Sequence, residues 1–165
     1  LALLPRSQFT LLVAGGGGGR LDHYKALAES LGLGREVKFL GLVSGVERLY
    51  PAVDLFVLPT LADPCPLSPL EAMAAGVATV MSSSEFNGSA ELVRGGEALI
   101  LSDPSDPREI AAALTKLMDA RSRAALAQKG RELVRQLTWE KTTADTLSAY
   151  NDVIQTRATY REAIG

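Results

Sequence analysis

Short apolar runs alternate with helical patterns along the first two-thirds of the chain, and most of the runs end at a glycine, a proline or a polar loop. Apolar runs without strict polar alternation are typical of strands in a parallel sheet that is covered on both faces. The runs predict strands at Phe9–Ala14, Val37–Leu40, Leu55–Leu58, Ala78–Met81 and Ala98–Leu101.

Between these runs the apolar spacing changes to the helical period. Pro69 suits the first turn of a helix that ends at Gly76, and Asp106 is placed to cap a helix that Pro107 opens. Strands separated by helices require parallel pairing through right-handed crossovers. We therefore expect an α/β fold with a doubly wound parallel sheet and extra C-terminal helices. The predicted helices are Arg20–Leu31, Val46–Val53, Pro69–Ala75, Ser89–Val93, Pro107–Ala120, Ser122–Leu137 and Trp139–Thr156.

Composition narrows the function classes. With 165 residues, 47% of them hydrophobic, the chain can bury a sizeable core and is not a disordered segment. A net charge of −2 gives no overall electrostatic case for binding nucleic acid. The single cysteine, Cys65, cannot form an intrachain disulfide, and no signal peptide or membrane-spanning run is evident. A start at Leu1, with no initiator Met, suggests an excised fragment.

Ligands of open parallel sheets bind beyond the carboxyl ends of the strands, and the unusual loops of this chain fall there. One is the glycine run Gly15–Gly19, which would let backbone approach a phosphate. It matches the dinucleotide fingerprint incompletely, because Arg20 occupies the last glycine position. A flexible turn is an equally good interpretation of this run alone. The other loops are Gly41–Gly45, Asp63–Leu70 and Ser82–Ser89.

The segment from Asp63 to Gly76 is more specific. Its two acids, Asp63 and Glu71, lie at opposite ends of a strand-to-helix loop, and the helix start between them offers free N–H groups. A diphosphate fits such a place, and carboxylates accept hydrogen bonds from vicinal sugar hydroxyls. Alternatively, Asp63 is a turn residue and Glu71 complements the helix dipole.

This segment resembles the E-x7-E motif of retaining GT-B glycosyltransferases of family four. Here it reads Asp-Pro-Cys-Pro-Leu-Ser-Pro-Leu-Glu-Ala-Met-Ala-Ala-Gly over residues 63–76. The resemblance covers nearly the whole chain in the right order. Further segments that resemble the family are Leu12–Gly15, Val37–Leu42, Ala52–Pro59, Asn87–Val93, Thr138–Trp139 and Tyr150.

By position, the resemblance implies that Glu71 binds the ribose hydroxyls of a nucleotide and that Asp63 contacts the donor sugar, these two being the candidate catalytic residues. It implies no metal and no cofactor besides the donor substrate, a nucleotide diphosphate sugar, expected to be UDP-linked. The other implied donor contacts are the N–H groups of Leu67 and Ser68 at the diphosphate, Leu42 and Val43 beside the base, Gly15 and Gly16 near the phosphates, and Pro66 where the family has a sugar-facing glycine.

The resemblance also implies a domain division. Residues 1–137 would form a nucleotide-sugar-binding domain without its first strand and helix, and residues 138–165 a helix that packs toward an absent N-terminal acceptor domain. The whole enzyme would transfer a sugar, with retention, to a glycan or lipid-linked acceptor in lipopolysaccharide or other cell-envelope synthesis. It would work in the cytoplasm or at the inner membrane face. The 165 residues alone are expected to show no turnover.

Two departures keep alternatives open. Asp63 is one methylene shorter than the family's Glu, and Pro66 has no N–H to donate to the sugar. A degenerate module that binds a nucleotide without transferring sugar is therefore a second hypothesis, and an oxidoreductase domain that binds a dinucleotide is a third, less favoured one. A basic stretch could meet anionic lipid, although a solvated helix face explains it as well; it contains Arg121, Arg123, Lys129, Arg131 and Arg135.

Overall fold

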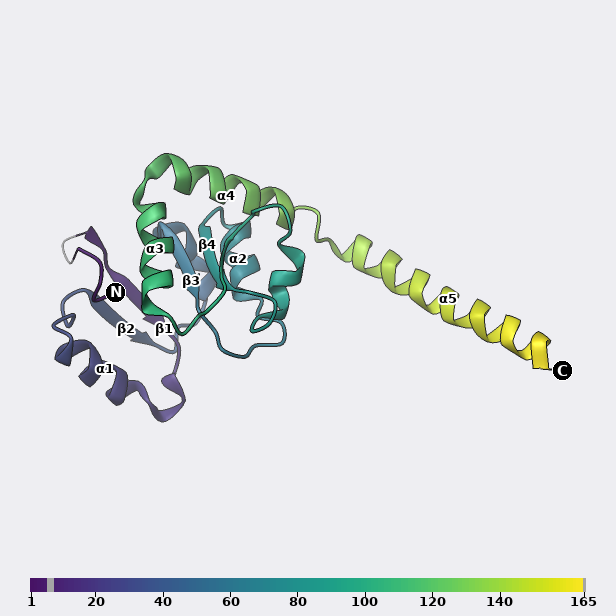
Figure 1. The fold of residues 1–165 in the computed structure, drawn as a ribbon, viewed down its shortest axis with the longest axis horizontal. Coiled ribbons are helices and arrows are strands. Elements are labelled where there is room, and N and C mark those ends of the chain that lie inside the picture. Colours follow the sequence, from purple (N-terminus) through teal and green to yellow (C-terminus); the bar gives the residue numbers. More distant parts are fainter. Residues whose placement is uncertain (6–7, 165) are drawn as a thin grey trace.

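The computed structural model describes residues 1–5 and 8–164. They form two parallel sheets with helices packed around them, and a long C-terminal helix follows (Figure 1). Each strand pairing among these residues is parallel, which confirms the predicted α/β class. One sheet pairs β1 (Leu11–Ala14) with β2 (Val37–Gly41), and in the other β4 (Ala78–Ser82) lies between β3 (Leu55–Leu58) and β5 (Leu99–Leu101).

The helices follow the predicted order, with shifted bounds. A helix follows β1, another follows β3, and three follow β5. Short 3₁₀ turns lie in several of the loops. The helices are α1 (Leu21–Ser30), α2 (Ser68–Ala74), α3 (Pro107–Met118), α4 (Ala120–Val134) and α5 (Trp139–Ile164), and the turns are η2 (Gly17–Gly19), η3 (Val46–Arg48), η4 (Tyr50–Ala52) and η5 (Gly88–Leu92).

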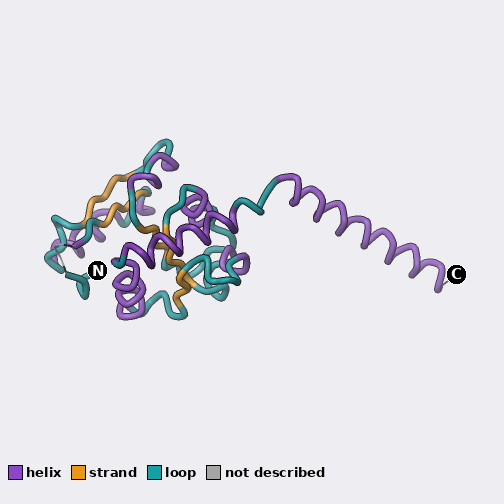
Figure 2. Tube along the Cα trace, turned by 90° about the horizontal axis from the view of Figure 1, so that it is seen from above, coloured by secondary structure: helices purple, strands orange, loops and turns teal. Residues whose placement is uncertain are grey.

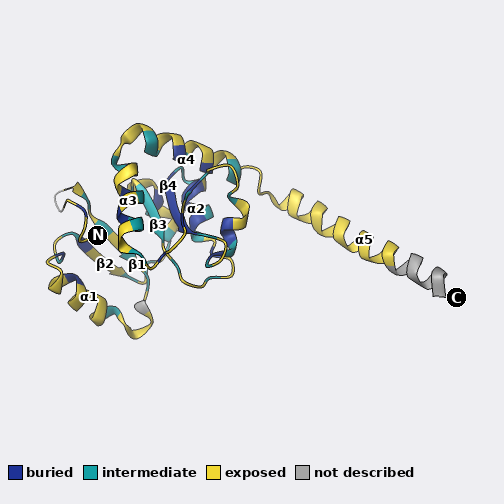
Figure 3. Cartoon of the chain, viewed as in Figure 1, coloured by how far each residue is buried: buried dark blue, intermediate teal, exposed yellow. Residues whose placement is uncertain are grey.

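β4 is buried along its whole length because helices cover both faces of its sheet (Figure 3). On one face Val80 packs with Leu114 and Leu117 of α3. On the other face Met81 packs with Met73 of α2. Full burial of a side chain of this size contributes about 1.5–3 kcal/mol, so this sheet holds the main core. The prediction of strands covered on both faces is confirmed here.

The β1–β2 sheet is covered on one face only. Val13 and Val37 pack against Ala28 of α1. The alternate residues face outward, and Leu12 and Leu40 keep 37% and 39% of their surface exposed. The prediction of strands covered on both faces is therefore wrong for this sheet, because α1 packs on one face while the other stays in contact with solvent.

The N-terminal segment links the two sheets. Leu4 is buried in the cluster formed by β4, α3 and α4. Leu1 and Phe9 pack against that cluster and also against the cluster beneath β1 and β2. These three side chains therefore supply apolar contacts that hold the smaller sheet beside the larger one.

The predicted helix at Val46–Val53 is instead a pair of 3₁₀ turns, η3 and η4. Leu49 donates to the carbonyl of Val46, and Val53 donates to that of Tyr50, both with the three-residue spacing. The cause is Pro51, which has no N–H for the carbonyl four residues back and whose ring collides with that carbonyl in an α-helix. The predicted helix at Ser89–Val93 is likewise a 3₁₀ turn, η5.

Helix α2 begins and ends as the sequence predicts. Pro69 lies in its first turn. Gly76 has φ of 79°, and its N–H donates to the carbonyl of Met73. Arg131 of α4 donates to the free carbonyl of Ala75 at 3.0 Å. This ending turns the chain directly into β4.

The basic stretch of α4 is partly used inside the fold. Arg123 donates to the carbonyls of Leu117 and Met118 at the end of α3, and it pairs with Asp54 at 3.4 Å. Arg131 holds the end of α2. Of the five basic residues, Arg121, Lys129 and Arg135 remain as exposed charges.

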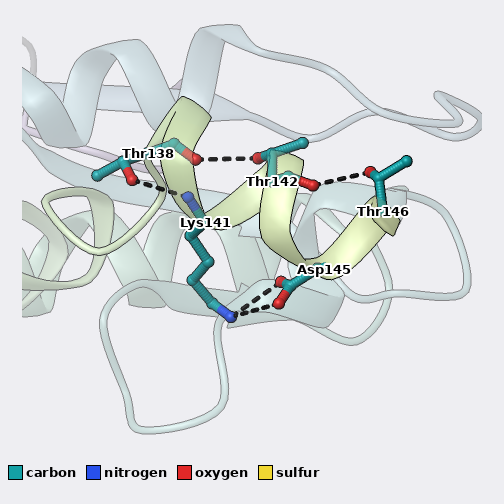
Figure 4. Close-up of polar contacts among 5 residues, drawn as sticks. All are labelled: Thr138, Lys141, Thr142, Asp145 and Thr146. Atoms are coloured by element: carbon teal, nitrogen blue, oxygen red, sulfur yellow. Dashed lines mark hydrogen bonds and ion pairs between the residues drawn. The ribbon is translucent and has the colours of Figure 1, made fainter. Parts of the chain in front are cut away.

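Helix α5 projects away from the rest of the chain, as two perpendicular views show (Figures 1 and 2). It starts at Trp139 as predicted and runs past the predicted end, Thr156. Its first turns are held by local contacts, including a hydrogen bond from the Lys141 N–H to Thr138 and an ion pair between Lys141 and Asp145 (Figure 4). Apolar side chains along it are exposed, namely Trp139, Leu147, Tyr150, Val153 and Ile154.

Candidate functional site

The glycine loop and the loop after β2 meet at the carboxyl ends of their strands. The N–H of Gly15 donates to the carbonyl of Gly41 at 2.7 Å, which fastens the two strand ends together. Gly15 has φ of 141°, a conformation that favours glycine. A Cβ on Gly16 would lie 3.3 Å from the side chain of Leu42. The structure thus brings Gly15, Gly16 and Leu42 together, with Val43 next in the chain.

Leu42 stands out as an apolar side chain in solvent. It is 87% exposed and rests over Gly16 without being part of a core cluster. An exposed leucine alone needs no explanation. Leu42 lies beside a glycine loop at a strand end, the edge of a parallel sheet at which ligands bind.

Asp63 is fixed between β3 and the loop after β4. Its N–H donates to the carbonyl of Phe86 at 2.9 Å, and its carbonyl accepts from Gly88 at 3.1 Å. Its carboxylate oxygen Oδ1 accepts from the N–H of Cys65 at 3.3 Å. A Cβ on Gly88 would overlap the carbonyl oxygen of Pro64, so the two loops approach as closely as glycine allows. The backbone of Asp63 is therefore held firmly in place.

Buried polar side chains fasten these loops further. Ser82, at the end of β4, donates to the carbonyl of Thr60 at 2.7 Å. Ser89 donates its hydroxyl to the carbonyl of Pro66, and Asn87 accepts from the N–H of Ser89 at 3.0 Å. Sequence reasoning did not assign roles to Ser82, Asn87 or Ser89. The sequence did offer a signal for these loop contacts, namely short polar residues at the end of an apolar strand and in the loop that follows it.

The start of α2 keeps its backbone amides open. Leu67 precedes the helix, is 62% exposed and supplies no side-chain cap. The first N–H groups of a helix have no partner within it, and within the described residues the N–H groups of Leu67 and Ser68 donate to no backbone carbonyl. Pro66 is buried, and its carbonyl is occupied by Ser89. Glu71 sits in the first turn of the same helix.

Tyr50 is the functional candidate that sequence reasoning missed. Its hydroxyl donates to Oε2 of Glu71 at 2.8 Å. Burial, the hydrogen bond to Glu71 and the negative charges of Glu71 and Glu47 all raise the pKa of Tyr50, so its hydroxyl keeps its proton at alkaline pH where an ordinary tyrosine ionises. The partner lies 21 residues away in sequence, so only the fold reveals the pair.

The predicted site residues thus fall into two groups. One lies at the ends of β1 and β2 and contains Gly15, Gly16, Leu42 and Val43. The other lies after β3 and contains Asp63, Pro66, Leu67, Ser68 and Glu71. No hydrogen bond joins the two groups within the described residues. Among the same residues, no cluster of three or more His, Cys, Asp or Glu side chains could hold a metal ion.

Parallel sheets covered by helices, with a glycine loop and an acid-flanked helix start at their carboxyl ends, form a Rossmann-like α/β domain. The family described as Glycosyl transferases group 1 matches residues 2–120. The chain belongs to this family.

Individual relatives agree with this assignment. A D-inositol 3-phosphate glycosyltransferase of Salinispora arenicola is 32% identical over 154 residues, covering 89% of this chain and 34% of the relative. This chain therefore spans about a third of that relative's length. The structure of Anabaena Alr3699/HepE in complex with UDP-glucose has 29% identity and a TM-score of 0.73, covering 90% of this chain and 43% of that one.

A second solved structure is WaaG, a glycosyltransferase involved in lipopolysaccharide biosynthesis. It is 25% identical with a TM-score of 0.73, covering 81% of this chain and 36% of that one. Among the described residues, no helix has both the length and the apolar character needed to cross a membrane.

Proposed function

We propose that this chain is the donor-binding part of a retaining glycosyltransferase that takes its sugar from a UDP-linked donor. The observation that carries the proposal is the segment from Asp63 to Glu71. It places one acid in a loop fastened to the end of β4 and the other in the first turn of α2, with open amides between them. The UDP-glucose complex of the Anabaena relative supports the choice of donor.

Each predicted residue has a role in this proposal. Glu71 accepts hydrogen bonds from the ribose hydroxyls, and Asp63 accepts from hydroxyls of the donor sugar. The amides of Leu67 and Ser68 receive the diphosphate. Charge that develops on the departing diphosphate is stabilised by these fixed donors, without a metal ion. Gly15 and Gly16 border the phosphates, Leu42 and Val43 border the base, and Pro66 shapes the sugar subsite.

The complete enzyme includes, in this proposal, an acceptor domain outside the 165 residues. Residues 1–137 form the donor domain, and the helix of residues 138–165 packs against the acceptor domain. The exposed apolar side chains of α5 support this arrangement, because contact with another domain would cover them. The acceptor is a glycan or a lipid-linked glycan, as the likeness to WaaG suggests. The 165 residues alone bind donor and do not turn it over.

We place the whole enzyme in the cytoplasm, or on the inner membrane face through peripheral contact. Arg121, Lys129 and Arg135 are the charges available for anionic lipid, since Arg123 and Arg131 are engaged within the fold. Three charges near a surface supply roughly 3 kcal/mol, which is a weak attachment. Vesicle sedimentation with anionic and with neutral lipid tests this contact, and equal recovery with both would contradict it.

A binding experiment tests the donor proposal. Calorimetric titration with UDP-glucose, GDP-mannose, ADP-glucose and NAD should show the tightest binding for the UDP-linked donor. Glu71→Gln should weaken it about tenfold or more, since a hydrogen bond to a charged group contributes about 1.5–3 kcal/mol. The matched control is Glu132→Gln, an exposed residue of α4 whose change should leave the affinity unaltered. Equal losses in both variants would contradict the role of Glu71.

A non-catalytic nucleotide-binding module is the second candidate. Two observations favour it: Pro66 lacks the N–H that the family's glycine supplies, and Oδ1 of Asp63 already accepts from Cys65. The candidates differ in whether the complete protein transfers sugar. Release of UDP in the presence of acceptor supports the transferase, and tight UDP binding without release supports the module.

A further inference from the structure

The ring of Tyr50 is held in an apolar cluster, and its hydroxyl makes a hydrogen bond to Glu71. Tyr50 is 5% exposed and packs in a cluster with Ala72 and Val77. The ring edge meets Phe56 in a T-shaped contact, with centroids 5.9 Å apart. These contacts fix the ring, and the hydroxyl reaches out of the cluster to the carboxylate of Glu71.

Glu71 differs from Tyr50 in being exposed at the start of α2. An exposed glutamate samples several rotamers, and ordering it on a ligand costs side-chain entropy. The 2.8 Å contact from a rigid donor to Oε2 removes much of that freedom before any ligand arrives. No other hydrogen bond to this carboxylate is made within the described residues, so Oε1 stays open.

We propose that Tyr50 is a positioning residue that orients Glu71, so that Oε1 accepts from the vicinal hydroxyls of a ribose. The idea rests on the proposed donor role of Glu71. A consequence for specificity follows. Nucleoside diphosphates that carry a ribose are preferred over those whose sugar lacks the vicinal hydroxyls. Tyr50 sets the size of that preference without touching the ligand.

The Tyr50 hydroxyl has two candidate roles, orienting Glu71 or simply being satisfied as a core hydroxyl, and the two have different consequences for ligand binding. A tyrosine whose hydroxyl is merely satisfied affects folding and leaves ligand preference unchanged. A preorganised carboxylate binds hydroxyls better because less order is lost on binding. Removing only the hydroxyl therefore separates the two roles, since phenylalanine keeps the contacts with Phe56, Ala72 and Val77.

The test measures dissociation constants of UDP and 2′,3′-dideoxyuridine diphosphate for the 165-residue chain. Tyr50→Phe should weaken UDP binding about two- to tenfold, the loss expected when one more side chain must be ordered on binding, and should change the dideoxy affinity less than about twofold. Tyr24→Phe, on exposed α1, is the matched control and should change neither. In a Glu71→Gln background, Tyr50→Phe should have no further effect on the preference.

The outcomes separate this inference from the donor proposal. If the wild-type chain binds both ligands equally, the ribose role of Glu71 fails and this inference with it. If the wild-type chain prefers UDP and Tyr50→Phe keeps the same preference, only the role of Tyr50 is overturned. A second measurement needs no variant. By proton NMR, the Tyr50 hydroxyl proton should stay protected from exchange with water when UDP saturates the chain. Loss of that protection would overturn the proposal.

Discussion

Replacing Gly88 with alanine should loosen the loops that hold Asp63. The new Cβ would overlap the carbonyl oxygen of Pro64, which belongs to the backbone and cannot rotate away. The loops must separate, which strains the hydrogen bonds from Gly88 to Asp63 and from Asp63 to Phe86. Overpacking costs about 1–3 kcal/mol and the loss of one of these hydrogen bonds about 1 kcal/mol, so we expect a loss of about 2–4 kcal/mol in the free energy of unfolding.

Urea unfolding followed by circular dichroism measures this loss, and thermal unfolding should show a midpoint lower by roughly 4–15 °C. Gly95→Ala is the matched control, because its Cβ would meet only the flexible carboxylate of Glu97. It should cost less than about 1 kcal/mol. Both variants reduce the entropy of the unfolded chain similarly, so their difference isolates the clash. Equal midpoints for the two variants would refute the close packing of the loops.

Three further predictions follow from other parts of the fold. The pKa of Tyr50 is raised in the folded chain, so the folded chain holds a proton that the unfolded chain releases above about pH 10. The free energy of unfolding therefore falls as the pH rises. Between pH 9 and 11, urea titrations should show a loss about 1.4 kcal/mol larger for the wild-type chain than for Tyr50→Phe. Asp106 caps α3, because its carboxylate accepts from the backbone N–H of Arg108 at 2.8 Å. Asp106→Ala should lower the free energy of unfolding by about 1 kcal/mol in the same assay, whereas Asp106→Asn should change it little. Deleting residues 139–165 should leave the unfolding midpoint unchanged, because the described side chains of α5 are exposed; a clear drop would mean that α5 stabilises the body of the domain.

Local signals predicted the elements well where the cause was itself local. Asp106 and Pro107 open α3 as expected, because a cap and a first-turn proline act within a few residues. Gly76 ends α2 for the same reason. Pro51 carried an equally local signal, and its missing N–H explains why the expected helix at Val46–Val53 is two 3₁₀ turns.

Features that depend on distant partners escaped prediction. The pairing of Tyr50 with Glu71 joins residues whose sequence neighbourhoods give no hint of contact. The exposed face of β1 and β2 depends on which element packs beneath them, and apolar runs cannot report that. The roles of Asp63 and Glu71 as donor contacts stay predictions, since the place of a carboxylate in the fold does not name the group that it binds.

The most direct test of the central claim is a titration of the isotope-labelled chain with UDP-glucose, followed by amide NMR. If a nucleotide sugar binds between the two acids, the largest shift changes should fall on Leu67, Ser68 and Glu71, with smaller ones at Gly15 and Gly16. Shift changes confined to other surfaces, or none at saturating donor, would contradict the account.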